Sequence, residues 1–522
     1  MPSKPYYNAA HALDRAARAH SHRTSLVYNS EKITVMEAAV LTRKLAQLLG
    51  SCGVSQGDRV VLISHNSPYH LLMHVACARL GAVFVPISYR LRYEDMQKMV
   101  DFCSPRVIVV EPEVGEQGMF YSTGTTVQFV IDDDGRAPAI APALRAGYFA
   151  LSAAYTGFDG EFITDNPDGT TALNSREYPE GPAALLFTSG TDGVAKAVML
   201  THKELWWGSR NFREGFEYST LDVELVVAPL SHIGGFNGTT LDLFTHGGTV
   251  VIMRDFDAAS LLRMLEKYRV RMMFGVPTMF TEMLAEPNFA DYDLSAFRLP
   301  LIGGAPATPA LLQQLEDAGL EPLNVYGMTE LAAAGCYLPA EYLPTHRGSI
   351  GRPFAHVTAR IVDPETAEDS KTGELWLQGP NVITSYWHGA AAESFVSGWF
   401  RTGDLVRVDD QGFLWLVGRI GGLINSGGEN ISPEEISDVI SRFPGVAQCA
   451  VVGVPDEKWG ETVGVALVLK PGAEVPTLSD VQDFTANFLA RYKLPRILKV
   501  LSQLPLNSHG KVDRAAVVDL LS

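Results

Sequence analysis

Short apolar runs alternate with longer amphipathic stretches along most of this 522-residue chain. The runs are rich in Val, Ile, Phe and Met and have the length of strands, whereas the stretches between them carry apolar residues at helical spacing. This alternation predicts an α/β fold. We expect buried strands at residues 59–63, 82–86, 106–110, 249–253 and 271–275.

Two regions of the chain depart from the regular alternation of strands and helices or precede it. Residues 111–181 are rich in Gly, Asp, Thr and Pro and have few periodic signals, so we expect loops there with one or two strands. Near the start of the chain, Leu13, Ala16 and Ala17 form one apolar face of a short first helix.

A glycine-rich stretch, GRIGG at residues 418–422, follows a strand-like run and precedes a segment with strands and helices of its own. The chain is too long for one simple core, and small residues are typical of hinges between domains. We therefore predict a large N-terminal domain at 1–418, a hinge at 419–422 and a small C-terminal domain at 423–522.

Composition narrows the classes of partner. The formal net charge of −17 argues against nucleic acid, because binding to phosphate backbones needs clustered Lys and Arg. No run of eighteen apolar residues is present, so no membrane-spanning segment is expected. The cysteines form no CxxC pair and no metal-ligand cluster, which favours a reduced, cytoplasmic setting. They are Cys52, Cys77, Cys103, Cys336 and Cys449.

The segment LLFTSGTDGVAKAVMLTH at residues 185–202 has the composition of a phosphate-binding loop. A strand-like run opens into hydroxylated residues and glycines, which let the backbone approach oxyanions, and a lysine adds a mobile positive charge. The GxxxxGKS/T spacing of a Walker loop is missing, which implies a different nucleotide chemistry. The candidate phosphate ligands are Thr188, Ser189, Gly190, Thr191 and Lys196.

Further motifs follow in order: YGMTE at 326–330, GWFRTGDL at 398–405, LVGRIGGLINSGGENISPEEIS at 416–437, VVGVPDEKWGE at 451–461 and LPLNSHGK at 504–511. With the phosphate loop, they resemble the adenylate-forming superfamily of acyl-CoA synthetases, amino-acid adenylation domains and beetle luciferases, over about residues 13–511. The chain is most similar to the acyl-CoA synthetases. The resemblance implies a large N-terminal α/β region of several subdomains, a cleft that holds the active site, and a small α+β C-terminal domain that rotates between two half-reactions.

The resemblance also assigns catalytic roles. Lys511 is implied to bridge the carboxylate of the acid and the α-phosphate of ATP, where a cation relieves the repulsion between two anions. Glu330 is the implied Mg²⁺ ligand, since a hard carboxylate oxygen suits that ion, and Thr329 is implied to touch the α-phosphate. His232, in PLSHIGGF, matches the histidine at the mouth of the acyl pocket.

The remaining implied contacts concern the nucleoside. Asp404 resembles the carboxylate that accepts hydrogen bonds from both ribose hydroxyls, and Arg419 contacts the same ribose. The residues implied to line or stack on the adenine are Gly303, Gly304, Ala305 and Tyr326.

The chain departs from the family pattern TSGTTGxPKG at three positions, with Asp192, Ala195 and Ala197 in place of Thr, Pro and Gly. A carboxylate beside a triphosphate is repulsive unless it faces solvent or helps to hold the metal. Gly421 stands where the hinge residue of the family is usually Asp or Lys. These departures are compatible with a rival function, a non-catalytic protein that binds nucleotide or acyl groups.

The substrate class follows from the residues after His232. Amino-acid adenylation domains carry a carboxylate there, whereas this chain has Ile233, Gly234 and Gly235, so an amino acid is disfavoured. Small residues at 234–235, 303–304 and 332–335 either leave room for a long or bulky acid or serve close backbone packing. We predict an ATP-dependent carboxylate:CoA ligase acting through acyl-AMP on a fatty or aryl-containing acid. An adenylating enzyme with another acceptor, such as a carrier-protein thiol, also fits the sequence.

Overall fold

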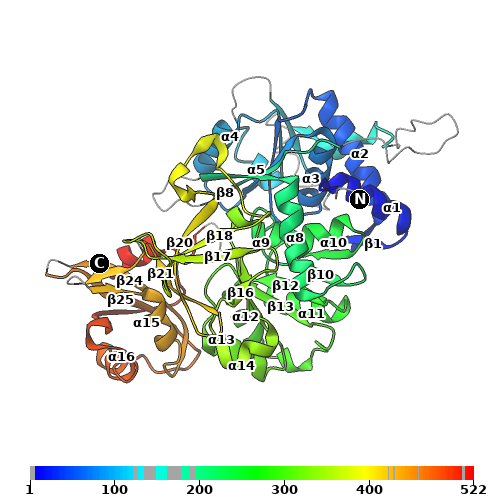
Figure 1. Ribbon diagram of the computed structural model, residues 1–522. Helices are drawn as coiled ribbons and strands as arrows, with labels where there is room; N and C mark the ends of the chain where they lie inside the picture. The colour runs from blue at the N-terminus through cyan, green and yellow to red at the C-terminus, as the bar shows by residue number, and fades with distance from the viewer. Residues whose placement is uncertain are drawn as a thin grey trace.

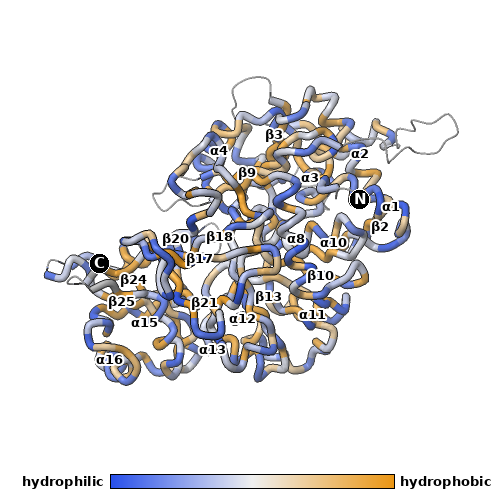
Figure 2. Tube along the Cα trace, in the orientation of Figure 1, coloured by the Kyte–Doolittle hydropathy of each residue, from blue (hydrophilic) through white to orange (hydrophobic). Residues whose placement is uncertain are grey.

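The computed structural model describes residues 6–120, 126–133, 148–160, 178–188, 196–420, 422–426, 429–456, 458–507 and 512–522. Figure 1 shows a large body, coloured blue to yellow, with a smaller lobe in orange and red at one side. Figure 2 shows apolar segments running through the strands of both parts, while hydrophilic segments gather at turns.

A seven-stranded sheet forms one layer of the body, in the order β7-β6-β5-β3-β4-β8-β9. Its pairs are parallel except for the β8/β9 hairpin. The strands are β3 (Arg59–Ser64), β4 (Val83–Ser88), β5 (Val107–Val110), β6 (Val127–Val130), β7 (Phe149–Ala150), β8 (Pro182–Thr188) and β9 (Lys196–Thr201). The associated helices are α2 (Val35–Ser51), α3 (Tyr69–Leu80), α4 (Tyr93–Cys103), α5 (Pro112–Gly115) and α7 (Leu151–Thr156).

A nine-stranded sheet forms a second layer, in the order β16-β15-β14-β13-β12-β10-β11-β1-β2. The strands are β1 (Thr24–Tyr28), β2 (Glu31–Thr34), β10 (Val223–Val226), β11 (Thr249–Ile252), β12 (Met272–Gly275), β13 (Leu299–Gly303), β14 (Leu323–Tyr326), β15 (Cys336–Tyr337) and β16 (Arg352–Pro353). The helices are α1 (Ala9–Ala19), α8 (His202–Phe216), α9 (Ile233–Phe236), α10 (Thr239–Thr245), α11 (Ala258–Lys267), α12 (Pro277–Leu284), α13 (Pro309–Asp317) and α14 (Leu343–His346), with the short η1 (Phe289–Asp291), η2 (Thr329–Leu331) and η3 (Ala340–Tyr342).

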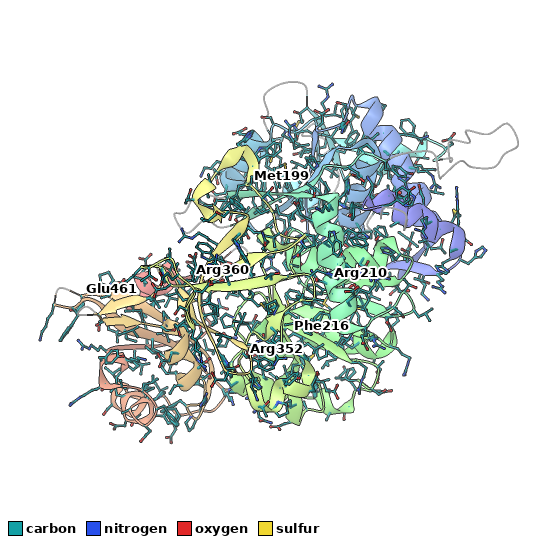
Figure 3. All side chains as sticks on the ribbon, in the orientation of Figure 1. Met199, Arg210, Phe216, Arg352, Arg360 and Glu461 are labelled. Carbon is teal, nitrogen blue, oxygen red and sulfur yellow. The ribbon has the colours of Figure 1, made fainter. Side chains whose placement is uncertain are left out.

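One hydrophobic core joins the inner faces of the two sheets through α1, α2, α3, α8 and α10. Helix α3 is buried from Tyr69 to Ala78, and apart from His70 and His74 the residues of this span are apolar or aromatic, as a helix surrounded by core requires. The outer face of the nine-stranded sheet packs on α11, α12 and α13 in a separate core. In Figure 3 side chains fill the space between the layers.

An antiparallel sheet links the body to the lobe. Its strands are β17 (Thr358–Val362), β18 (Thr372–Gln378), β19 (Phe395–Val396), β20 (Trp399–Val408) and β21 (Leu414–Arg419), with η4 (Trp387–Gly389) and η5 (Ala392–Ser394) between them. The lobe has its own five-stranded sheet and two small cores. It contains β22 (Ile424–Ser426), β23 (Glu429–Ile431), β24 (Val446–Asp456), β25 (Gly460–Leu469), β26 (Ile497–Leu501), α15 (Pro433–Ile440), α16 (Leu478–Thr485), α17 (Arg514–Leu521) and η6 (Arg491–Lys493).

The predicted α/β class with a smaller C-terminal domain is confirmed, and all five predicted strands are present as β3, β4, β5, β11 and β12. Within 111–181, the described residues hold the strands β6 and β7 together with two short helices, α5 and α7. The chain changes from one sheet to another between Arg419 and Ile424, although the domain boundaries and the mobility of the lobe stay predictions. Throughout the described ranges, no helix has both the length and the apolar character needed to cross a membrane.

Candidate functional site

Three predicted nucleoside-binding residues meet where the antiparallel sheet adjoins the nine-stranded sheet. Asp404 on β20 and Arg419 at the end of β21 are cross-strand partners, and Arg419 Nε lies 2.7 Å from Asp404 Oδ1. Tyr326, which ends β14, donates its hydroxyl to Asp404 Oδ2 at 2.6 Å. Both carboxylate oxygens therefore have a partner, and each keeps a further lone pair for a ligand hydroxyl.

Burial dominates the electrostatics of this cluster. It raises the pKa of Asp404, although Arg419 and the Tyr326 hydroxyl oppose the shift. The pKa of Tyr326 lies well above its ordinary value because the partly buried hydroxyl is desolvated and lies beside the Asp404 carboxylate. Burial lowers the pKa of Arg419, but the attraction of Asp404 and its neighbours outweighs this effect and the pKa is raised. The guanidinium thus remains charged beside a carboxylate that little water reaches.

Glu330 lies in η2, four residues after Tyr326, and its side chain is buried. Tyr386 donates its hydroxyl to Glu330 Oε1 at 2.8 Å, and Lys196 Nζ lies 5.8 Å from the centre of the Tyr386 ring. Burial raises the pKa of Glu330, whereas hydrogen bonds from the backbone and Tyr386 and the charges of Arg419 and Lys196 lower it. A cation bound at this carboxylate would favour its ionised form.

The two clusters form one electrostatic site, because the charge of Arg419 acts on both Asp404 and Glu330. Sequence reasoning missed Tyr386, which no motif spacing singled out. A phenol that contacts a buried carboxylate from another segment is visible only in three dimensions. Thr329 precedes Glu330 in the same 3₁₀ turn and is half-buried.

Close backbone packing shapes the YGMTE loop. A Cβ on Gly327 would lie 1.8 Å from the Ala333 carbonyl oxygen. Ala332 and Ala333 both adopt left-handed conformations, at φ 46° and 77°. The Asn381 side-chain amide donates to the carbonyls of Leu331 and Ala334, each at 2.8 Å, and so holds this turn in place. The loop is fixed by contacts that only small residues allow.

The predicted phosphate loop lies between β8 and β9. Thr188 and Lys196 face one another as the last cross-strand pair of this hairpin, and Thr188 Oγ1 donates to the Lys196 carbonyl at 3.4 Å. Ala197 is buried in β9. The predicted ligands Ser189, Gly190 and Thr191 lie outside the described residues, as do Asp192, Ala195, Lys511 and Gly421.

Other predicted residues lie at the carboxyl ends of neighbouring strands. β10, β12, β13 and β14 run parallel in the nine-stranded sheet. Gly303 ends β13, and Gly304 follows in a left-handed conformation with φ 77°. Ala305 comes next, half-buried. His232 follows β10 and begins α9, with its carbonyl accepting from the Phe236 amide at 2.9 Å. Ligands bind at this edge of open α/β sheets.

The glycines near His232 serve close packing. A Cβ on Gly235 would lie 2.5 Å from the Pro229 carbonyl oxygen, and one on Gly303 would lie 2.5 Å from the Val325 carbonyl oxygen. A Cβ on Gly234 would lie 2.5 Å from the ring of Phe274. The small residues could have left room for a bulky acid or served close packing. Close packing describes these three glycines, and Phe274 occupies the space beside Gly234.

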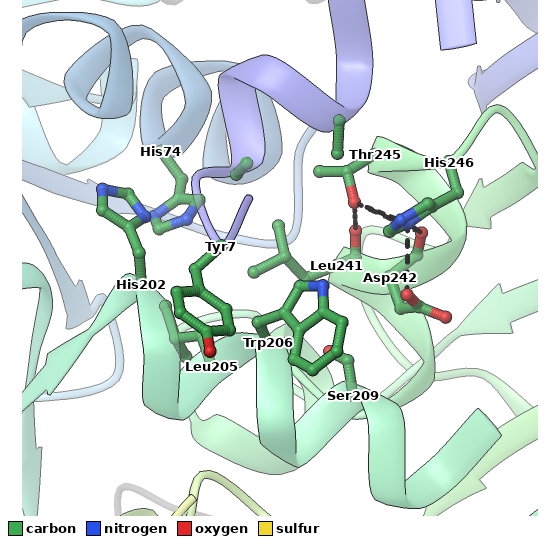
Figure 4. Close-up of a pocket in the computed structure, with 12 residues that line it drawn as sticks. Tyr7, His74, His202, Leu205, Trp206, Ser209, Leu241, Asp242, Thr245 and His246 are labelled. Carbon is green, nitrogen blue, oxygen red and sulfur yellow. Dashed lines mark hydrogen bonds and ion pairs between the residues drawn. The ribbon is translucent and has the colours of Figure 1, made fainter. Parts of the chain in front are cut away.

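A small cavity of about 30 Å³ lies elsewhere, between α1, α3, α8 and α10 (Figure 4). His74 and His202 lie side by side at one end, with ring centres 6.2 Å apart, and His246 contacts the Asp242 carbonyl at the other end. Burial lowers the pKa of His74 to about 3 and that of His202 to about 4. The volume suits one or two water molecules, and none of the predicted site residues lines the cavity.

Two family models match most of this chain. The family model of the AMP-binding enzyme matches residues 13–387, and that of the AMP-binding enzyme C-terminal domain matches residues 435–511. The indoleacetate–CoA ligase of Aromatoleum aromaticum is 32% identical over 514 residues, which cover 98% of this chain and 97% of that protein. A feruloyl-CoA synthase of an Amycolatopsis species is 33% identical over 507 residues, which cover 96% of this chain and 97% of that protein.

One solved structure that is similar to this chain contains a bound intermediate. The o-succinylbenzoate CoA synthetase of Bacillus subtilis, in complex with its acyl-adenylate intermediate, is similar with a TM-score of 0.79 and 26% identity. The match covers 98% of each chain.

Proposed function

This chain belongs to the AMP-binding enzyme family, and we propose that it is an ATP-dependent carboxylate:CoA ligase that works through an acyl-AMP intermediate. The family membership confirms the resemblance to acyl-CoA synthetases. The observation that carries the proposal is the joint placement of Asp404, Arg419, Tyr326 and Glu330 in one electrostatic site around two buried carboxyl groups. The acid is fatty or aryl-containing, in keeping with relatives that act on indoleacetate and make feruloyl-CoA.

In the first half-reaction, a carboxylate oxygen of the acid attacks the α-phosphorus of ATP and pyrophosphate leaves. Asp404 accepts hydrogen bonds from the ribose hydroxyls while Arg419 holds its carboxylate in position. Gly303, Gly304, Ala305 and Tyr326 line the adenine. Ser189, Gly190, Thr191, Lys196 and Thr188 surround the phosphates, and Thr329 contacts the α-phosphate.

Glu330 is the residue that would hold Mg²⁺. Its carboxyl is buried and burial raises its pKa, so a bound cation would favour the ionised form. When bound, Mg²⁺ supplies neutralisation of the phosphate charge. Lys511 bridges the carboxylate and the α-phosphate, which lowers the repulsion between the two anions.

In the second half-reaction, the thiol of CoA attacks the acyl carbonyl, the thioester forms and AMP leaves with the oxygen it gained from the acid. The C-terminal domain, residues 423–522, rotates about the hinge at 419–422 between the two steps. His232 controls access of the acid and the thiol at the mouth of the acyl pocket. We further propose a cytoplasmic setting, consistent with the five cysteines being unpaired in the structure.

The test uses the full-length protein with ATP, Mg²⁺ and CoA and a panel of phenylacetates, cinnamates and saturated fatty acids. Pyrophosphate, AMP and thioester are measured separately. We expect one pyrophosphate and one AMP for each thioester. Pyrophosphate release without thioester across the whole panel would indicate another acceptor, and no pyrophosphate with any acid would indicate a non-catalytic binder.

A further inference from the structure

Glu224 is a buried glutamate near the start of β10, the strand whose carboxyl end leads to His232. The residue is 1% exposed. Oε1 accepts hydrogen bonds from the hydroxyls of Thr239 at 2.6 Å and Thr240 at 2.9 Å, in the first turn of α10. Oε2 is also buried, but it makes no hydrogen bond with any residue that the structure describes. One carboxyl oxygen, Oε1, therefore has hydrogen-bond donors, and the other, Oε2, has none among the described residues.

Glu224 lines a narrow crevice along β10. The crevice continues past Val226 to Ala228 and is closed laterally by Gly235 and Phe274. From Glu224 to Ala228 it extends on the order of 13 Å, at about 3.3 Å per residue of strand. In this structure it is too narrow to admit a water molecule, so Oε2 obtains no partner from solvent inside the crevice.

Strand register places the crevice on the same side of the sheet as His232. Glu224 pairs with Met272 of the parallel strand β12. Because side chains two positions apart share a face, Val226 and Phe274 lie on the same face as Glu224. Helices α9 and α10 pack on this face, and His232 begins α9 at the carboxyl end of β10. A chain that passes His232 and descends along β10 thus meets Phe274 first and Glu224 last.

Phe274 blocks this path. Its half-buried ring lies close to both Gly234 and Gly303. A Cβ on Gly234 would lie 2.5 Å from the ring, and a Cβ on Gly303 would lie 3.1 Å from it. A ligand that reaches Glu224 has to displace this ring or stack along it. A flat aromatic group matches a slot between a strand and a phenyl ring better than a branched group does.

An unpartnered carboxyl oxygen at this depth is costly. Burial without a hydrogen bond carries a penalty that a ligand donor would remove. Burial also raises the pKa of Glu224 to about 7. Above that pH the group is a carboxylate, which only accepts hydrogen bonds. Its chemical complement is an N–H or O–H group.

We propose that Glu224 recognises the distal end of the acid, and that the preferred substrates are aryl or arylalkyl acids with an N–H or O–H donor remote from the carboxyl group. The proposal rests on the ligase activity proposed above. A saturated fatty acid would place a methyl group against Oε2 and leave it unpaired, so fatty acids are the poorer substrates. Thr239 and Thr240 orient the carboxyl group by fixing Oε1, which leaves Oε2 toward the crevice.

Matched acids test the proposal in the wild-type enzyme. We would measure kcat/KM for pyrophosphate release at about pH 8.5, where the Glu224 carboxylate is ionised. The acids are phenylacetate and cinnamate with 4-hydroxy, 4-amino, 4-methoxy or no substituent. The 4-hydroxy and 4-amino acids should exceed the other two by about ten- to a hundredfold, the size of one hydrogen bond to a buried charge. Equal rates for all four substituents, or a preference for saturated fatty acids, would overturn the proposal and leave the ligase activity intact. Pyrophosphate release with none of these acids and with no saturated fatty acid would overturn both.

Glu224→Gln is the decisive variant. The amide oxygen can still accept from Thr239 and Thr240, while the amide nitrogen replaces Oε2 and is a donor. The preference for donor-bearing acids should fall to about onefold to threefold, and the 4-methoxy acids should gain relative to the 4-hydroxy acids. An unchanged preference in a folded Glu224→Gln enzyme would overturn the proposal. Glu37→Gln, which changes a carboxyl in the capping box of α2, is the matched control and should keep the wild-type preference. If Glu224→Gln does not fold, the ratio of kcat/KM between donor-bearing and other acids in the wild-type enzyme decides the proposal.

Discussion

The pKa values of the carboxyl groups in this site are set by burial, which raises them, and by a small number of contacting groups, which lower them. Asp404 and Glu330 both have raised pKa values because burial penalises their charge, and in each case one phenol donates to the carboxyl group. The phenols differ in origin. Tyr326 belongs to the same motif as Glu330, whereas Tyr386 comes from the segment before η4. The two hydroxyls therefore act as fixed donors to buried carboxyl groups and oppose the rise in their pKa values.

Tyr386→Phe tests this role. Removing the hydroxyl takes away a contact that lowers the pKa of Glu330, so the pKa should rise further and the ionised fraction should fall. The Mg²⁺ concentration for half-maximal pyrophosphate release should increase by about tenfold at about pH 6 and by less at about pH 8.5, because high pH restores the carboxylate.

Tyr492→Phe serves as the control, since it removes an exposed phenol from the C-terminal lobe. An equal Mg²⁺ requirement in Tyr386→Phe and the control at both pH values would mean that Tyr386 does not tune Glu330.

At the scale of elements, the site depends on loops whose shape is set by backbone contact. Gly327 is the sharpest case, because a Cβ there would meet the Ala333 carbonyl oxygen at 1.8 Å. Ala333 itself is held in a left-handed conformation. The loop between β14 and β15 can therefore adopt its shape only when residue 327 has no side chain.

Gly327→Ala should lower the free energy of unfolding by about 3 kcal/mol, the size of a severe overpacking defect that only a backbone shift can relieve. The midpoint of thermal unfolding should fall accordingly, and binding of ATP should weaken because Tyr326 and Glu330 flank this loop.

Gly50→Ala is the matched control. Gly50 lies in α2, and a Cβ there would meet nothing within 4 Å, so the change should stabilise the protein by about 0.5–1 kcal/mol. A Gly327→Ala protein as stable as the wild type would contradict the packing described for this loop.

The elements also show how far the sequence predicts the structure. Apolar β-branched runs predicted β3, β5 and β11 because strands buried on both faces need such residues. The pairing of Asp404 with Arg419 depends on antiparallel register across a turn, and Tyr386 reaches Glu330 across the fold. Neither contact has a local signature. Glu224 was not singled out either, since its burial follows from the packing of α10 on β10.

For the whole molecule, the proposed rotation of the lobe between two successive reactions depends on the connection between the body and the lobe. The chain leaves the antiparallel sheet at Arg419 and enters the sheet of the lobe at Ile424. Arg514 of α17 and Glu434 of α15 form an ion pair at 2.6 Å within the lobe. The lobe has its own cores, so a rigid rotation of the lobe needs torsional change only in the short connection.

Gly421→Pro tests rotation at this connection. Proline fixes φ near −65° and removes a backbone donor, so one arrangement of the domains should be trapped. We expect pyrophosphate release to persist while transfer from supplied acyl-AMP to CoA falls by about a hundredfold or more. Wild-type rates in both assays would show that the lobe pivots at another residue, such as Gly422 or Gly418.

The proposed ligase activates the acid by forming a bond to the α-phosphorus of ATP and then transfers the acyl group to a thiol. The most direct measurement supplies an acid with ¹⁸O in both carboxylate oxygens, together with ATP, Mg²⁺ and CoA, and analyses the nucleotide product by mass spectrometry. We expect AMP that carries one ¹⁸O atom for each thioester formed, with unlabelled pyrophosphate. Unlabelled AMP, or ADP with labelled phosphate, would contradict activation of the acid as an acyl-AMP.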